Sequence, residues 1–113
     1  MREAGVVLCT TDTLEQAETL AGRLVQEGLA ACVNVIPTLT SFYIWREKLR
    51  RDSESLLVIK TFRDVFPRLA ERLRDLHPYE VPEIIFLGVR DGARDYLAWM
   101  DGQIPASDAD RES

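Results

Sequence analysis

The only histidine of the chain lies in a short segment rich in groups that can bind a metal or move a proton. Residues 77–83 read His-Pro-Tyr-Glu-Val-Pro-Glu and combine an imidazole, a phenol and two carboxylates. Pro78 and Pro82 forbid a continuous helix, and each restricts the residue before it to extended backbone shapes. The segment is therefore predicted to be a stiff loop, and stiff loops on a rigid scaffold are where functional sites tend to be built.

A second group with metal-binding chemistry is the thiol of Cys9, at the end of an apolar run. A thiolate with an imidazole suits copper or zinc better than a hard ion such as magnesium. Cys9 and His77 alone do not complete a tetrahedral site, so further ligands would come from another subunit, from Glu80 or from water. In the alternative interpretation, Cys9 is a small buried apolar residue and His77 caps the end of a helix. Cys32 lies in an apolar strand, where core packing is its expected role.

Aromatic side chains with polar tips are numerous for so small a chain: Tyr43, Trp45, Tyr79, Tyr96 and Trp99. Such residues suit packing between subunits. The functional alternative is a cleft between subunits that holds a small ligand. Its candidate residues are Tyr43, Trp45, Lys60, Tyr79, Glu80 and Trp99. Lys60 ends a buried strand, so it either extends to solvent or pairs with an acid.

Length and composition indicate one ordinary globular domain. The chain has 113 residues, of which 46% are hydrophobic and 29% charged, and its formal net charge is −5. We expect a single domain over residues 1–105 and a disordered acidic tail over residues 106–113. The acidic balance disfavours nucleic acid and anionic membranes as partners. No signal peptide or membrane-length apolar run is visible and the cysteines form no disulfide framework, so we expect a cytoplasmic protein with reduced thiols.

Hydrophobic periodicity predicts the elements that must position these residues. Four strands are expected from the apolar runs, at residues 6–9, 31–45, 53–61 and 83–89. Three helices are expected from amphipathic spacing, at residues 13–27, 65–77 and 91–103. Asp12 and Asp64 are the expected N-caps of the first two helices, and Gly28 is the expected stop of the first. Pro37 should bend the long second strand, and residues 46–52 should form a polar hairpin end.

The order of these elements is β-α-β-β-α-β followed by a helix. It predicts an α+β, ferredoxin-like βαββαβ sandwich with an extra C-terminal helix. Right-handed crossovers give an antiparallel sheet of order 4-1-3-2. In that order the first strand, the second helix and the hairpin all end at one edge of the sheet. Cys9, His77, Tyr43 and Trp45 should therefore converge there.

Six blocks of the sequence resemble the CutA divalent-cation tolerance protein family. They occur in the family's order and lie at residues 7–11, 30–34, 37–45, 57–61, 77–83 and 95–99. The resemblance implies a ferredoxin-like subunit, a tight homotrimer and a link to tolerance of copper and other divalent metals, and it implies no defined reaction. Through it, Cys9 and His77 match a cysteine and a histidine proposed as copper ligands in a bacterial member. A second histidine of that pattern is replaced here by Leu76.

These observations lead to a ranked set of functions. The first is a non-enzymatic, cytoplasmic homotrimer that responds to metal ions, needs no cofactor, and has copper or another divalent metal as its candidate ligand. The alternative is a PII-like trimeric signalling scaffold that binds a small anionic or aromatic ligand between subunits; the sequence has no Gly-rich phosphate loop for a nucleotide. An enzyme is disfavoured, because His77 and Asn34 form no nucleophile–base constellation.

Overall fold

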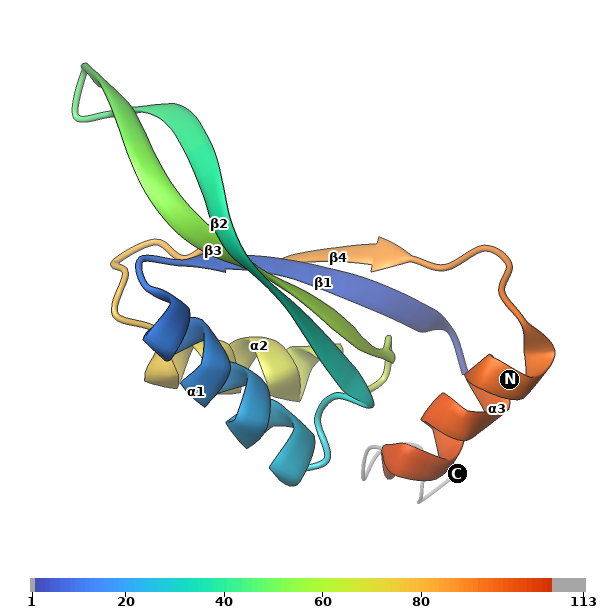
Figure 1. Cartoon of the computed structure of the whole chain (residues 1–113). Helices are drawn as coiled ribbons and strands as arrows, with labels where there is room; N and C mark the ends of the chain where they lie inside the picture. Colours follow the sequence, from blue (N-terminus) through green and yellow to red (C-terminus); the bar gives the residue numbers. More distant parts are fainter. Residues whose placement is uncertain (1, 107–113) are drawn as a thin grey trace.

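A computed structural model describes residues 2–106 of the chain (Figure 1). Its elements in chain order are β1 (Ala4–Thr11), α1 (Leu14–Gln26), β2 (Cys32–Trp45), β3 (Lys48–Phe62), α2 (Phe66–Leu76), β4 (Ile85–Gly88) and α3 (Arg94–Gln103). The four strands form one antiparallel sheet of order β2-β3-β1-β4, which is the predicted order counted from the other edge. The predicted ferredoxin-like fold with a C-terminal helix is confirmed. From residue 107 onward, the predicted tail lies outside the described residues.

The two crossover helices cover one face of the sheet, and α3 lies beyond one end of it (Figure 1). Strand alternation separates the two faces. On the helix side, Val7, Cys9, Leu57 and Ile59 are fully buried against α1 and α2. The opposite face carries apolar residues that stay half-buried or exposed: Val6, Leu8, Leu56, Val58, Ile85 and Leu87. The subunit therefore has one well-packed core and one uncovered apolar sheet face.

The hairpin between β2 and β3 is much longer than the sequence predicted. The prediction of a polar hairpin end over residues 46–52 is wrong, because only Arg46 and Glu47 form the turn. Both adopt positive φ, 51° and 69°, and a two-residue turn of this kind matches the twist of the flanking strands. Cross-strand pairing then continues to Trp45 opposite Lys48. Polar residues are tolerated in these arms because they extend past the sheet, as Figure 1 shows.

The predicted bend in β2 is confirmed by a register shift between Ile36 and Leu39, on either side of Pro37. Proline cannot donate to the ladder, so a bulge at an edge strand is where it fits. The predicted stop of α1 is confirmed as well. Gly28 adopts φ of 72°, the left-handed conformation in which helices commonly end.

Both predicted N-caps are wrong. The cap of α1 is Thr13 rather than Asp12: Thr13 is extended and its hydroxyl accepts a hydrogen bond of 3.1 Å from the Gln16 amide. The start of α2 has no side-chain cap. The Asp64 carboxylate is instead bound by the Arg2 guanidinium, at 3.0 and 3.1 Å. The Arg2 guanidinium binds that carboxylate at two points and with a full opposite charge, whereas a cap would offer it only uncharged backbone N–H groups.

Candidate functional site

The end of β1 and the end of α2 meet at one sheet edge, as the topology predicted. The Nε2 atom of His77 lies 2.7 Å from the carbonyl oxygen of Thr10. The Sγ atom of Cys9 lies 3.8 Å from the same oxygen. The two predicted metal-binding side chains therefore contact one backbone atom, although they are 68 positions apart in the chain.

The imidazole of His77 is held by contacts on both of its nitrogens. Its Nε2–H donates to Thr10, and its Nδ1 accepts a 3.1 Å hydrogen bond from the Tyr79 amide. This pattern corresponds to the neutral tautomer protonated on Nε2. The backbone amide of His77 also donates to Leu73 and ends α2. The side chain is only 7% exposed, so it ties the loop of residues 77–83 to β1.

The thiol of Cys9 is fully buried on the helix side of the sheet. Burial, together with the negative charges of Glu83 and Glu54, raises the pKa of Cys9 to about 12. The group is therefore a protonated thiol at neutral pH, whereas metals bind the thiolate. Within residues 2–106, no group of three or more His, Cys, Asp or Glu side chains is arranged to hold a metal ion. The described part of one chain thus offers an incomplete donor set.

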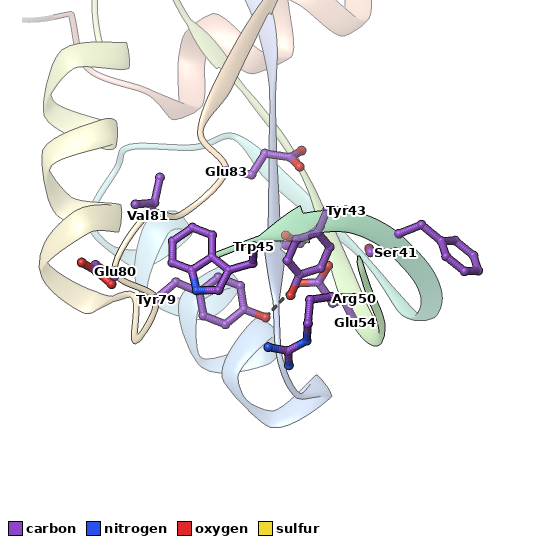
Figure 2. Close-up of a pocket in the computed structure, with 11 residues that line it drawn as sticks. Ser41, Tyr43, Trp45, Arg50, Glu54, Tyr79, Glu80, Val81 and Glu83 are labelled. Atoms are coloured by element: carbon purple, nitrogen blue, oxygen red, sulfur yellow. Dashed lines mark hydrogen bonds between the residues drawn. The ribbon is translucent and has the colours of Figure 1, made fainter. Parts of the chain in front are cut away.

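A cavity of about 600 Å³ lies between the β2–β3 hairpin and the loop of residues 77–83 (Figure 2). It is lined by Thr10, Ser41, Phe42, Tyr43, Trp45, Arg50, Glu54, Tyr79, Glu80, Val81 and Glu83. Tyr79 joins the two walls, because its hydroxyl donates a 2.7 Å hydrogen bond to Glu54 on β3. Burial and the Glu54 carboxylate raise the pKa of Tyr79 well above its usual value, so the phenol stays protonated and remains a donor.

The residues predicted for a ligand cleft divide into two groups. Tyr43, Trp45, Tyr79 and Glu80 line the cavity, where Figure 2 places the three rings close together. Lys60 and Trp99 lie elsewhere. Lys60 donates to the side-chain oxygen of Asn34 on the neighbouring strand β2. Trp99 packs against Tyr96 within α3, with ring centroids 5.6 Å apart.

The predicted cleft omitted three charged residues that line the cavity: Arg50, Glu54 and Glu83. Arg50 and Glu54 lie on β3 at even-numbered positions, and Arg50 stands directly opposite Tyr43. Period-two alternation would have assigned Tyr43, Arg50 and Glu54 to one face, but only after the turn had been placed at residues 46–47. Glu83 follows the second proline of the stiff loop, so its position was a usable signal.

Fold and site together define a class of protein. Its subunit is a ferredoxin-like α+β domain that carries, at one sheet edge, a buried thiol–imidazole pair and a ligand-sized cavity lined by aromatic residues. Within residues 2–106, no helix is both long and apolar enough to cross a membrane.

Comparison with known proteins identifies the family. The family model described as "CutA1 divalent ion tolerance protein" matches residues 5–103, and the chain belongs to this family. It is a family of tolerance proteins, not of enzymes. The divalent-cation tolerance protein CutA of Thermus thermophilus is 50% identical over 95 residues, which cover 84% of this chain and 92% of that protein.

Solved structures agree with this assignment. CutA1 from Oryza sativa matches with a TM-score of 0.91 at 38% identity, covering 93% of this chain and 96% of that one. A protein from Archaeoglobus fulgidus, described as a periplasmic divalent cation tolerance protein CutA, matches with a TM-score of 0.88 at 29% identity, covering 90% of this chain and 99% of that one. The ferredoxin-like subunit is therefore shared across distant relatives.

Proposed function

We propose that this divalent-cation tolerance protein forms a homotrimer and takes part in the cytoplasmic response to metal ions, without an enzymatic reaction and without a required cofactor. Trimeric assembly is implied by the family resemblance. The observation that carries it is the uncovered apolar face of the sheet, which a monomer would leave in water.

Several exposed apolar groups support self-assembly. Phe42, Ile44 and Leu49 on the hairpin arms are 65%, 65% and 71% exposed. The uncovered sheet face adds Ile85 and Leu87, each about half exposed. Monomeric proteins rarely leave large contiguous apolar patches in water. The long strand β2 also lies at the edge of the sheet, where unpaired backbone groups favour pairing with another chain.

Sedimentation equilibrium tests the assembly directly. We expect a stable trimer at micromolar protein concentration. A stable monomer under those conditions would rule out the proposed assembly, because the apolar face would then be tolerated in water.

Copper is the metal predicted for Cys9 and His77, and their contacts set the conditions that it must meet. Both side chains contact the Thr10 carbonyl oxygen, so one ion could bind both of them once they no longer contact that oxygen. Binding would require the ring to give up one of its hydrogen bonds and the thiol to lose its proton against a raised pKa. Within residues 2–106 no third His, Cys, Asp or Glu side chain is arranged to join them, so further ligands would come from another subunit or from water. We therefore expect weak binding that strengthens with pH, because the thiolate is the ligand.

A competitive titration of the reduced protein with Cu(I) and Cu(II) tests the metal prediction. The variants are Cys9→Ser and His77→Ala, and Cys32→Ser is the matched control because Cys32 is the other free thiol of the described chain. Binding that both site variants lose, and the control keeps, would establish the site. Binding that neither variant changes would remove copper from this edge.

The alternative function is a PII-like trimeric scaffold that binds a small ligand in a cleft. The cavity supports it, since its volume falls within the roughly 300–1,000 Å³ usual for small-molecule sites. A thermal-shift screen of metabolites tests it, and a screen without any stabilising compound would count against it.

The cytoplasmic location is supported by two free cysteines in the described residues, Cys9 and Cys32, as expected in a reducing compartment. Fractionation of cells producing the full chain tests it, and recovery outside the cytoplasm, as the description of the Archaeoglobus relative would suggest, would contradict it.

A further inference from the structure

The cavity between the hairpin and the loop of residues 77–83 has an excess of negative charge. Its lining holds three carboxylates and one guanidinium, a formal net charge of −2, from Glu54, Glu80, Glu83 and Arg50. Two ion pairs at its rim leave this total unchanged. Arg46 approaches Glu80 at 3.6 Å, and Arg50 approaches Asp52 at 3.7 Å. Adding Arg46 and Asp52 to the lining therefore contributes one charge of each sign.

The two phenols and the one guanidinium of the cavity lining are already paired with carboxylates. The Tyr79 hydroxyl donates to Glu54, and the Tyr43 hydroxyl donates to Asp52. Each phenol therefore already gives its proton to a carboxylate. The side chain of Arg50 shares its charge with the same Asp52. Apart from three neutral donors, the Thr10 and Ser41 hydroxyls and the Trp45 indole N–H, the cavity presents carboxylate oxygen and aromatic surface to a ligand.

The aromatic surface is arranged around one space. Figure 2 shows the rings of Tyr43, Trp45 and Tyr79 gathered at the cavity, with Glu83 above them. Aromatic faces carry negative electrostatic potential and attract cations, most strongly organic ammonium groups that can shed water. Negative charge at the cavity also affects neighbouring acids. The Glu54 and Glu83 charges help to raise the pKa of Cys9, and Glu54 helps to raise the pKa of Tyr79.

We infer that this cavity binds a small organic cation, an alkylammonium or quaternary ammonium group, whose carbon atoms contact Tyr43, Trp45 and Tyr79 and whose charge faces Glu54 and Glu83. The inference rests on the alternative function proposed above and specifies the chemistry of the cleft's ligand. The ligand is a cation, in place of the small anionic ligand that the sequence suggested. A bare divalent ion does not fit, because within residues 2–106 no three carboxylate, thiol or imidazole groups are arranged to hold one.

Three probes of similar size and shape separate charge from apolar contact: tetramethylammonium, tert-butanol and trimethylacetate. Each is titrated against the full, assembled protein at constant ionic strength, with ligand-observed NMR and calorimetry as readouts. We expect tetramethylammonium to bind in roughly the millimolar range, with upfield shifts of its methyl protons from the aromatic rings. The neutral and anionic probes should bind about tenfold more weakly or not at all.

Matched carboxylate-to-amide variants locate the charge. Glu54→Gln keeps an acceptor for Tyr79, and Glu83→Gln removes a charge without changing size. Each should weaken tetramethylammonium binding about fivefold, as expected for one half-buried ion pair. Glu18→Gln, on the exposed side of α1 and outside this cavity, is the control and should leave binding unchanged.

The inference would be overturned by no binding of tetramethylammonium, by equal binding of all three probes, or by equal losses in Glu18→Gln and the cavity variants. Stronger binding of trimethylacetate would also overturn it while leaving a ligand cleft in place. Tetramethylammonium has no lone pair with which to coordinate a metal or replace a metal ligand. A negative result with tetramethylammonium therefore leaves the copper titration and the sedimentation test unaffected, because those experiments measure metal binding and oligomeric state.

Discussion

Replacing His77 with phenylalanine separates a structural role of this ring from a metal-binding role. Phenylalanine keeps the aromatic volume and the ring contact with Tyr79, whose centroid lies 4.6 Å from that of His77. It removes the hydrogen bonds to the Thr10 carbonyl and from the Tyr79 amide. Any loss of stability in the absence of metal then reports on those two hydrogen bonds.

The expected loss follows from the burial of the ring. A typical intramolecular hydrogen bond contributes about 0.5–1.5 kcal/mol, and stranding a buried partner costs about 1–3 kcal/mol. His77 is 7% exposed and makes two such bonds. We expect His77→Phe to lower the free energy of unfolding by about 2–3 kcal/mol. His77→Gln, whose amide can still donate to Thr10, should lose about 1 kcal/mol.

Urea unfolding followed by far-UV circular dichroism measures these losses. All variants are compared at one protein concentration, because the stability of an oligomer depends on concentration. A chelator is present in one series and copper in the other. A loss below about 0.5 kcal/mol in chelator for His77→Phe would refute the structural role, since two buried hydrogen bonds cannot be worth so little. A loss that appears only with copper would assign His77 to a metal instead.

Three further predictions concern other parts of the subunit. Burial raises the pKa of Cys9 to about 12 from a reference value of 9.0. The stability that depends on the protonated thiol is therefore complete below pH 9 and falls by about 1.4 kcal/mol per pH unit between the two values. Cys9→Ala should flatten this alkaline fall in the free energy of unfolding, and a profile equal to that of the parent protein would contradict the assignment. A Cβ atom at Gly5 would lie 2.1 Å from the Phe86 ring, so Gly5→Ala should lower the free energy of unfolding by about 1–3 kcal/mol. Chemical unfolding measures this loss, and a double variant with Phe86→Leu that recovers none of it would rule out the clash. Trp45→Ala should weaken self-association, measured by sedimentation equilibrium, more than copper binding, and an unchanged trimer of unchanged thermal stability would remove Trp45 from the subunit interface.

Much of the fold was predictable because its signals are local. The apolar run ending at Cys9 marked β1, and the helical spacing after Thr13 marked α1. Gly28 and Pro37 act through their own backbone conformations, which do not depend on distant residues. The topology then followed from the handedness of the two crossovers, and with it the meeting of β1 with the end of α2 at His77.

The candidate site was only partly predictable, because its geometry depends on register. Tyr43, Trp45, Tyr79 and Glu80 were found by residue type, since aromatic and charged groups near stiff loops stand out in sequence. The partnership of Tyr79 with Glu54 could not be read in the same way, because it depends on where the hairpin turns.

The sequence by itself determined the order of elements, the family and the convergence of Cys9 with His77 at one sheet edge. Tertiary structure alone decided which groups share a face and which groups are already paired. The turn at Arg46 and Glu47 contains neither glycine nor asparagine, so its position is not marked by the usual turn residues. That turn sets the pairing register of β2 with β3. A shift of one residue in register would turn every side chain of the shifted strand to the other face, so the charge and donors of the cavity follow from cross-strand pairing.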